Sequence, residues 1–205
     1  MQVSWAELLA QIDGCTKCGL CRARTNPAPG EGDLQARIMF VGEGPGAQED
    51  LQGRPFVGPA GQLLDKMLAA IALKREQVYI ANIVKCRPPG NRVPTLDEAA
   101  ACLPYLRAQV GLVSPRIIIC LGATAARYCL GGEVRITRDR GKWVQRKGVW
   151  MMATYHPAAL LRAPEKKREA WQDFKSIRER LRAMEMEEEE QDDGKSANAE
   201  PGEDT

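Results

Sequence analysis

The chain has 205 residues, the length of one ordinary domain with a buried core. No apolar run is long enough to span a membrane, and the first residues lack the basic start and apolar stretch of a signal peptide. We therefore expect a cytoplasmic protein without a membrane partner, in which the seven cysteines stay reduced and serve metal binding or burial.

The net charge of +2 is divided unevenly between two regions. From Glu185 onward there are ten acidic residues and one lysine, so residues 1–184 hold 28 basic against 17 acidic residues and carry +11. A body with this charge favours polyanions such as DNA as partners. The tail, 185–205, has no aromatic residue and cannot bury enough apolar surface to order itself. The sequence therefore predicts one domain over 1–184 and an acidic tail that is disordered from about residue 187.

Helices and strands alternate along the domain. Capping boxes, helical periodicity and glycine stops predict helices at about 4–12, 60–73, 95–113, 122–131 and 165–184. Apolar runs predict strands at 38–41, 78–84 and 116–121, and a hairpin is expected from 142–146 and 149–154. The stretch between 42 and 60 and the stretch after 154 are expected to be loops. This alternation is typical of an α/β protein with a parallel sheet layered by helices.

Four residues lie near the carboxyl ends of four different predicted strands: Gly42, Asn82, Gly122 and His156. In open parallel sheets, ligands bind beyond the carboxyl ends of the strands. We therefore expect these four residues to meet at one edge of the sheet and to form a binding site.

Four cysteines are arranged as two pairs, Cys15-x2-Cys18 and Cys86-x15-Cys102. A Cys-x2-Cys pair lets two thiolates face one ion, and a second pair completes four sulfur ligands for zinc or an iron–sulfur cluster. The long second spacing favours a 4Fe–4S cluster over zinc. Cys21 could replace one ligand, and simple burial of all the thiols is the alternative.

A glycine-rich turn, Gly42–Gly46, follows the first predicted strand. Its backbone amides could bind a carbonyl oxygen or a phosphate, although a plain structural turn is equally consistent with the sequence. The turn matches neither the dinucleotide-binding nor the Walker pattern, so no nucleotide cofactor is expected. Phe56 lies in a nearby Pro/Gly loop, where it is either a stacking platform for a flat ring or a loop anchor.

Two polar side chains belong to the expected site. Asn82 interrupts an apolar strand, and its amide can pair with the N–H and C=O of a ring or bridge to the neighbouring backbone. His156 is the only histidine and follows a strand end, where an imidazole can stabilise a departing anion; a structural histidine is the alternative.

Leu160 and Leu161 precede Arg162 in the segment after this histidine. Adjacent leucines in an arginine-bearing loop indicate an apolar wedge that opens a base stack, although one of the two could instead pack in the core.

Together these motifs resemble the family 4 uracil-DNA glycosylases, a bacterial and archaeal thermostable family with a 4Fe–4S cluster. The resemblance extends from Leu8 to Leu181 and omits the acidic tail. The motifs that carry it are Cys15-x2-Cys18, Gly42–Asp50, Gly53–Gly58, Asn82–Pro89, Cys102 and His156–Arg162. The resemblance implies a three-layer α/β sandwich around a four-stranded parallel sheet, and a monomeric DNA repair enzyme that hydrolyses the N-glycosidic bond of uracil in DNA.

The resemblance also implies roles for single residues. Phe56 would stack on the flipped-out uracil, Asn82 would read its edge, and the backbone of Gly42–Gly44 with the His156 side chain would contact its O2 side. The residues expected to contact DNA are Leu160, Leu161, Arg162, Arg87 and Arg92. The residues expected to hold a structural cluster are Cys15, Cys18, Cys86 and Cys102.

Two positions depart from the best-studied uracil glycosylases. Gly44 occupies the position of an aspartate that positions water, so Glu43 or Glu49 is needed instead, and we assign Glu43 as catalytic together with His156 and Asn82. Gly46 occupies the position of a tyrosine that excludes the methyl group of thymine. Glu49 is the expected substitute there and is counted among the residues that bind the base.

Two other functions are compatible with these motifs. A related enzyme crosslinks covalently to the abasic site, but it carries a histidine in an inserted loop after the third cysteine, and the segment from Arg87 to Arg92 has none. A non-catalytic DNA-binding module with zinc or an iron–sulfur cluster is the second alternative.

Overall fold

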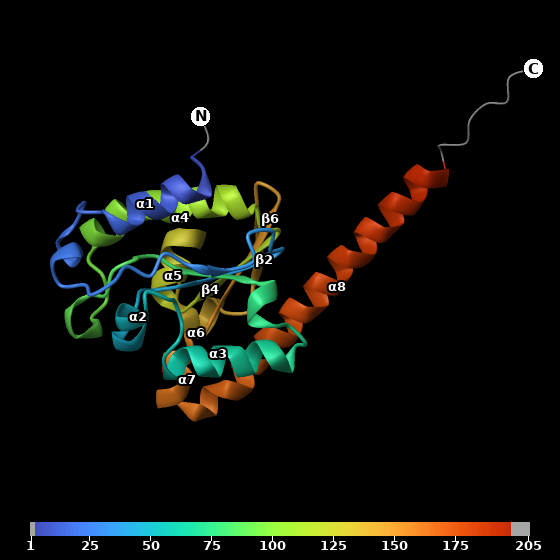
Figure 1. The fold of residues 1–205 in the computed structure, drawn as a ribbon. Coiled ribbons are helices and arrows are strands. Elements are labelled where there is room, and N and C mark those ends of the chain that lie inside the picture. The colour runs from blue at the N-terminus through green and yellow to red at the C-terminus, as the bar shows by residue number, and fades with distance from the viewer. Residues whose placement is uncertain (1–2, 198–205) are drawn as a thin grey trace, which may run out of the picture.

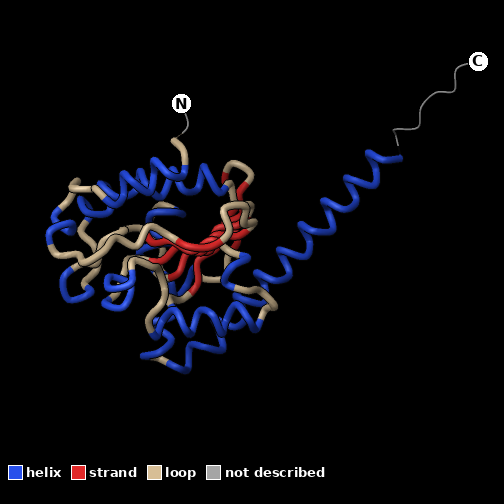
Figure 2. The backbone as a smooth tube through the Cα atoms, viewed as in Figure 1, coloured by secondary structure: helices blue, strands red, loops and turns tan. Residues whose placement is uncertain are grey.

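The computed structural model describes the backbone of residues 3–197 and the side chains of residues 3–188 (Figure 1). Figure 2 shows a central sheet with helices on both sides, which agrees with the predicted α/β sandwich. Six strands form the sheet in the order β1-β3-β2-β4-β6-β5. Their bounds are β1 (Glu31–Gly32), β2 (Ile38–Gly42), β3 (Tyr79–Asn82), β4 (Ile117–Leu121), β5 (Trp143–Arg146) and β6 (Val149–Thr154).

The four central strands, β3-β2-β4-β6, are parallel, which confirms the predicted parallel core. The sheet as a whole is mixed, because β1 and β5 join its two edges in antiparallel orientation. The four expected parallel strands are therefore present, and the two antiparallel edge strands widen the sheet to six. The short β1 has no apolar run to reveal it, whereas β5 is one arm of the expected hairpin.

The helices pack on the sheet in two layers (Figures 1 and 2). One face is covered by α1 (Trp5–Asp13), α4 (Leu96–Val113) and α5 (Ala123–Leu130), and the other by α3 (Pro59–Ala70) and the first half of α8 (Lys167–Ala197). Shorter helices are α2 (Ala47–Gln52), α6 (Ile136–Asp139) and α7 (Pro157–Arg162), and 3₁₀ turns lie at Gly19–Arg22, Arg75–Gln77, Pro89–Asn91 and Pro164–Lys166. Alternate residues of each central strand face the two layers, which is why their sequences are apolar throughout.

The expected capping boxes are present at the starts of α1 and α4. Ser4 and Thr95 accept hydrogen bonds from the backbone of Glu7 and Glu98, whose carboxylates bond back to the two capping residues. Helices α2 and α7 replace loops that we expected, because each has six residues and no periodic apolar pattern to announce it.

Helix α8 extends to Ala197, beyond the expected end near Met184, so the backbone of 187–197 is helical rather than disordered (Figure 1). Glutamate and methionine are good helix formers, and Glu188 pairs with Arg37 and Arg116 at 2.6 and 3.5 Å. Residues 198–205 lie outside the described residues. Within the described part of the chain, no helix has both the length and the apolar character of a membrane span.

Candidate active site and cysteine cavity

The carboxyl ends of β2, β3, β4 and β6 meet at one cavity of about 510 Å³. Gly42, the last residue of β2, does not line the cavity but lies against Asn82 and Phe56, which do. Among the residues that line the cavity are Glu43, Glu49, Phe56, Asn82, Gly122 and His156. The structure therefore brings together the residues that the sequence places after different strands.

Asn82 presents an unpaired amide oxygen at this cavity. Its side chain is 1% exposed, and Oδ1 is the one buried side-chain nitrogen or oxygen atom of the described residues without a hydrogen-bond partner. Leaving a buried acceptor unpaired costs about 1–3 kcal/mol. Gly42 makes room for this amide, because a Cβ there would lie 2.4 Å from Asn82 Oδ1. A ligand with an N–H group can satisfy the unpaired oxygen.

Phe56 forms part of the cavity wall. Its ring centroid lies 5.5 Å from that of His156, and the two rings are inclined by 31°. The residue has φ = 52°, a left-handed conformation that costs a non-glycine residue about 1–3 kcal/mol. The ring also packs tightly on Gly42, where a Cβ would lie 2.5 Å from Phe56 Cζ. The ring is thus both buried in the loop and turned toward the cavity.

Glu49 fixes the loops on either side of α2. Its Oε2 accepts a hydrogen bond from Gly46 N at 3.1 Å, and its Oε1 accepts from Val57 N and Gly58 N at 2.9 and 2.7 Å. A Cβ at Gly46 would lie 2.7 Å from Glu49 Oε2, so glycine is needed for this contact. Because both carboxylate oxygens already accept backbone N–H groups, Glu49 is poorly suited to activate water, contrary to one of our two expectations for that role.

His156 is held as a neutral imidazole. Its Nδ1 accepts a hydrogen bond from Ala158 N at 3.2 Å, so the ring proton of the neutral form lies on Nε2. Burial, with a smaller contribution from the positive charge of Arg162, lowers the pKa of His156 to about 4. At neutral pH the side chain therefore offers one N–H donor and no charge.

Glu43 follows β2 and lines the cavity beside Gly44. Its Oε2 accepts a hydrogen bond from the hydroxyl of Thr124, at the start of α5. A Cβ at Gly44 would lie 2.7 Å from a methyl carbon of Val84, so this position has no space for an aspartate. Glu43 is therefore the carboxylate of this turn that is free of backbone constraints.

The two leucines of α7 differ in exposure. Leu160 is 1% exposed and packs with Tyr155 and Ala170, whereas Leu161 is 44% exposed. Our expectation that Leu160 contacts DNA is therefore wrong, because its side chain belongs to the core. Leu161 remains available at the surface, and Arg162 lines the cavity next to it in sequence.

The two arginines of the segment after Cys86 have partners within the protein. Arg92 forms a two-pronged ion pair with Glu98 at 2.7 and 2.8 Å, which lowers the pKa of Glu98 to about 2. Arg87 donates to Asn91 Oδ1 at 2.8 Å. Arg92 also lines the mouth of the cavity. These contacts order the segment.

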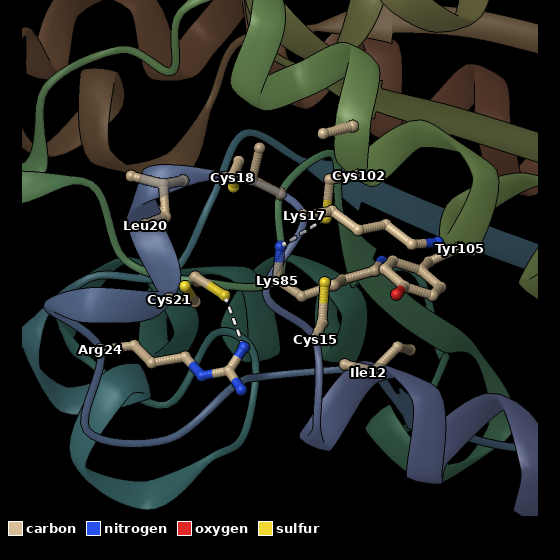
Figure 3. A pocket seen from close by; sticks show the side chains of 13 residues that line it. Ile12, Cys15, Lys17, Cys18, Leu20, Cys21, Arg24, Lys85, Cys102 and Tyr105 are labelled. Carbon is tan, nitrogen blue, oxygen red and sulfur yellow. Dashed lines mark hydrogen bonds between the residues drawn. The ribbon is translucent and has the colours of Figure 1, made fainter.

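The predicted ligand cysteines line a second cavity, shown in Figure 3. The sulfur atoms of Cys15, Cys18, Cys21 and Cys102 lie around one common space, and Cys86 is a fifth lining residue. No three His, Cys, Asp or Glu side chains of the described residues lie close enough to hold a single ion. All five cysteines nevertheless line the same small cavity, whose volume is about 10 Å³.

Hydrogen bonds to two of these sulfurs come from basic residues. Arg24 Nη1 lies 3.1 Å from Cys86 Sγ, and the backbone N of Lys85 lies 3.3 Å from Cys102 Sγ (Figure 3). Burial raises the pKa of the Cys102 thiol to about 11 and also raises that of Cys86. These thiols are protonated at neutral pH in the metal-free protein, so metal binding has to release their protons.

Lys85 connects the two cavities. Its fully buried Nζ donates to the backbone oxygen of Asn82 at 2.8 Å and to Gln109 Oε1 at 2.6 Å. Burial lowers the pKa of Lys85 to about 8. We did not identify Lys85, Thr124 or Arg24 from the sequence. A charged residue within the apolar run that ends at Cys86 was the available signal for Lys85.

A flat ring with hydrogen-bond donors and acceptors fits the strand-end cavity, and a body with this positive charge fits nucleic acid. The fold and the cavity together define an α/β protein with a binding site for a small polar ring at the strand ends. The comparisons with known proteins identify the family. The model of the uracil DNA glycosylase superfamily matches residues 29–175.

The chain belongs to the type-4 uracil-DNA glycosylases, which confirms the predicted family and its DNA repair activity on uracil. It is 47% identical to the type-4 uracil-DNA glycosylase of Sulfurisphaera tokodaii, over 86% of this chain and 84% of the relative. Identity to the Archaeoglobus fulgidus enzyme is 46%, over 84% and 91% of the two chains. Identity to the Thermotoga maritima enzyme is 50%, over 74% and 80%.

Proposed function

We propose that this protein flips uracil out of DNA into the strand-end cavity and hydrolyses its N-glycosidic bond. The observation that carries the proposal is the unpaired Oδ1 of Asn82, which is buried beside the rings of Phe56 and His156. Each group matches one need of a flipped pyrimidine: an acceptor for its N–H, an aromatic face, and a donor for a carbonyl oxygen.

Recognition of uracil depends on Asn82. Its Oδ1 accepts from N3–H of uracil, and its amide nitrogen donates to O4. Cytosine presents an acceptor at N3 and a donor at N4, so both pairs would be mismatched. Unpaired polar groups in a buried site give strong rejection. Phe56 stacks on the ring of either base and therefore contributes affinity rather than selectivity.

Bond cleavage is assisted by His156 and the glycine turn. As the bond between C1′ and N1 breaks, its electron pair passes into the uracil ring and negative charge develops on O2. The Nε2–H of His156 and the backbone amides of Glu43 and Gly44 stabilise this charge by hydrogen bonding. Because the lowered pKa leaves the imidazole neutral at neutral pH, His156 stabilises this charge as a hydrogen-bond donor and not as a general acid.

Glu43 positions the water that completes hydrolysis. The water oxygen bonds to C1′, and its proton passes to the carboxylate and then to solvent, while the uracil anion leaves and is protonated in solution. The hydrogen bond from Thr124 orients the carboxylate toward the cavity. Glu43 is preferred over Glu49 because the oxygens of Glu49 already bind backbone amides.

The duplex is held by the surface around the cavity. Leu161 fills the space left by the base, and Arg162 contacts the neighbouring phosphates together with Arg87 and Arg92. Because these contacts are ionic, affinity for DNA falls as salt rises.

Cys15, Cys18, Cys86 and Cys102 would supply the four thiolate ligands that a 4Fe–4S cluster needs, and Cys21 is a further thiol in the same lining. Such a cluster would cross-link the N-terminal segment, which holds Cys15 and Cys18, to α4, which holds Cys102, and its role would be structural. Arg24 and the Lys85 amide stabilise the thiolate form of two ligands by hydrogen bonding. Iron and acid-labile sulfide at about four each per chain is the expected composition.

The test is a duplex with one uracil, followed by alkali. We expect cleavage at the uracil and none at cytosine or thymine, with free uracil released in equal amount. His156→Ala is expected to slow release by about 10²–10³-fold, the loss that follows removal of one donor to a developing oxyanion. Its affinity for uracil-containing DNA stays near that of the wild type.

The alternatives give different results in the same assay. Binding of the duplex without release of uracil would favour a non-catalytic module. A protein–DNA adduct that survives denaturation would favour the crosslinking enzyme.

A further inference from the structure

Arg75 is absent from the lining of the strand-end cavity, but its guanidinium group contacts the loop that carries Phe56. It lies in the 3₁₀ turn before β3, and its side chain is only 16% exposed. Nη1 donates to the carbonyl oxygen of Phe56 at 3.1 Å, and Nη2 donates to the carbonyl oxygen of Pro55. One nearly buried side chain therefore holds two successive peptide units.

Two carboxylates fix the orientation of this guanidinium group. Asp65 of α3 accepts from Nη1 at 3.0 Å, and Glu31 of β1 accepts from Nε at 3.5 Å. A planar fork with partners on several sides cannot rotate without breaking hydrogen bonds. Arg75 is thus anchored to a helix and to an edge strand, and it presents two fixed donors to the loop.

The loop is held from its other side as well. Glu49 accepts the N–H groups of Val57 and Gly58, the two residues after Phe56. The Phe56 carbonyl also lies against α3, where a Cβ at Gly61 would be 1.7 Å from the Phe56 oxygen. Residues 55–58 are therefore clamped between an arginine fork and a carboxylate, with no room for the carbonyl to turn toward α3.

We infer that Arg75 is a positioning residue for base stacking, because it holds Phe56 in the left-handed conformation that places its ring in the cavity wall. A φ of 52° persists in a phenylalanine only where the surroundings impose it. Without the fork, the backbone can return to negative φ, and the ring no longer stacks on the face of the bound base. The inference rests on the stacking role proposed for Phe56.

The test compares Arg75→Met with Arg54→Met. Arg54 is a matched control, because it also binds the Glu31 carboxylate, at 2.6 and 2.9 Å. Unlike Arg75, it donates no hydrogen bond to the carbonyl oxygens of Pro55 and Phe56. Arg75→Met is expected to lower kcat/KM for uracil release by about 10- to 100-fold, as misplacement of a substrate-positioning group does. It should weaken inhibition by free uracil in proportion. Arg54→Met should change either quantity less than about twofold, as exposed ion pairs contribute little.

A double-mutant cycle with Phe56→Ala separates positioning from general stability. If Arg75 acts through Phe56, Arg75→Met adds no further loss in the Phe56→Ala background. Independent, multiplicative losses would overturn the inference, as would a lower unfolding temperature of Arg75→Met with unchanged rates. If Arg75→Met does not fold, Arg75→Lys replaces it in the double-mutant cycle. Lysine keeps the positive charge, but its single ammonium group cannot donate to the Pro55 and Phe56 carbonyl oxygens in the two-pronged geometry of arginine.

The rates of the two single variants distinguish a failure of the role proposed for Phe56 from a failure of the role inferred for Arg75. A Phe56→Ala protein with the wild-type rate would refute the proposed role of Phe56. A slow Phe56→Ala protein beside a wild-type rate in Arg75→Met would refute only the role of Arg75.

Discussion

The strand-end cavity and the cysteine cavity share the segment 82–86, yet they differ in how ready they are to bind. At the strand ends, His156 is neutral and Asn82 has an unpaired acceptor, so a base can bind without any change of protonation. In the cysteine cavity, burial keeps the Cys86 and Cys102 thiols protonated until a metal replaces their protons. The sheet therefore prepares the first cavity, whereas metal binding in the second would first require its thiols to lose their protons.

This difference has a physical origin in what surrounds each cavity. The backbone of Asn82 is held by its pairing with Gly42 on the neighbouring parallel strand. Side chains pack closely around Gly42 and Gly44, so neither position has room for a larger residue. The cysteines instead come from a 3₁₀ turn, a loop and the first half of α4. We expect substitutions in the first cavity to change rates while preserving the fold, and substitutions in the second to change stability first.

The largest change in rate is expected from Asn82→Ala. Removing the amide leaves the uracil N3–H and O4 without partners, so uracil release should slow by about 10²–10³-fold while DNA binding persists. Single-turnover kinetics and fluorescence anisotropy measure the two quantities. Asn26→Ala is the control, because its amide donates to the Asp50 and Leu51 carbonyls outside this cavity. Full activity of Asn82→Ala would remove the basis of the proposed recognition.

The next largest effect is expected from Cys102→Ser, and it should appear in stability. Loss of one ligand is expected to deplete iron and sulfide and to lower the unfolding temperature by roughly 5–10 °C, the shift produced by a loss of about 3 kcal/mol in a chain of this size. Metal analysis and thermal unfolding measure this. Cys129→Ser is the control, because Cys129 does not line the cysteine cavity. Equal iron in both variants would contradict the proposed ligand set.

A smaller effect concerns the protonation of His156, whose folded-state pKa is lowered to about 4. The unfolded chain binds this proton near pH 6.5, so the free energy of unfolding should fall as pH decreases from 6.5 toward 4 and should be flat above. The slope from this group is at most about 1.4 kcal/mol per pH unit. His156→Ala lacks it.

His156 is the only histidine, so its imidazole signal in an NMR titration is unambiguous. We expect a neutral ring at pH 5.5 with the proton on Nε2. A midpoint near 6.5 would mean that the imidazole is solvated and not enclosed in the cavity.

The sequence predicts the sheet better than its edges. The runs that became β2, β3 and β4 are short and apolar on both faces, as buried parallel strands are, so their positions follow from the local sequence. The two residues of β1 pair with β3 through backbone hydrogen bonds that no side-chain pattern records. Helix α8 continues past Met184 because good helix formers can extend a helix whose first half is already packed on the sheet. The high charge of this segment, from which we predicted disorder, does not indicate such an extension.

The same distinction applies to the sites. Asn82 and His156 follow strand ends, and the cysteines have a ligand spacing, so local sequence is enough to name them. Arg75 and Glu49 act on the Phe56 loop across 19 to 20 and 8 to 9 residues of sequence, through backbone atoms that every residue possesses. Such contacts are visible only when the tertiary structure is known. Leu160 was misassigned for the related reason that burial within α7 depends on α8.

The smallest effect on stability is expected at the amino ends of the strands, the end of the sheet opposite to the strand-end cavity. Arg37 and Arg116 directly precede β2 and β4, and Glu188 of α8 pairs with both at the amino ends of these strands. The paired side chains are between 33% and 55% exposed, so each pair contributes about 0–1 kcal/mol.

Glu188→Gln should therefore lower the free energy of unfolding by no more than about 1 kcal/mol, and the difference should vanish in high salt. Glu187→Gln removes the same charge one residue away and serves as the control. Uracil release should be unchanged in both variants. Glu188 pairs with arginines at the amino ends of the strands, so it does not neutralise the basic residues around the strand-end cavity that we expect to bind DNA. A gain in DNA affinity with Glu188→Gln alone would instead place this helix within reach of the bound duplex.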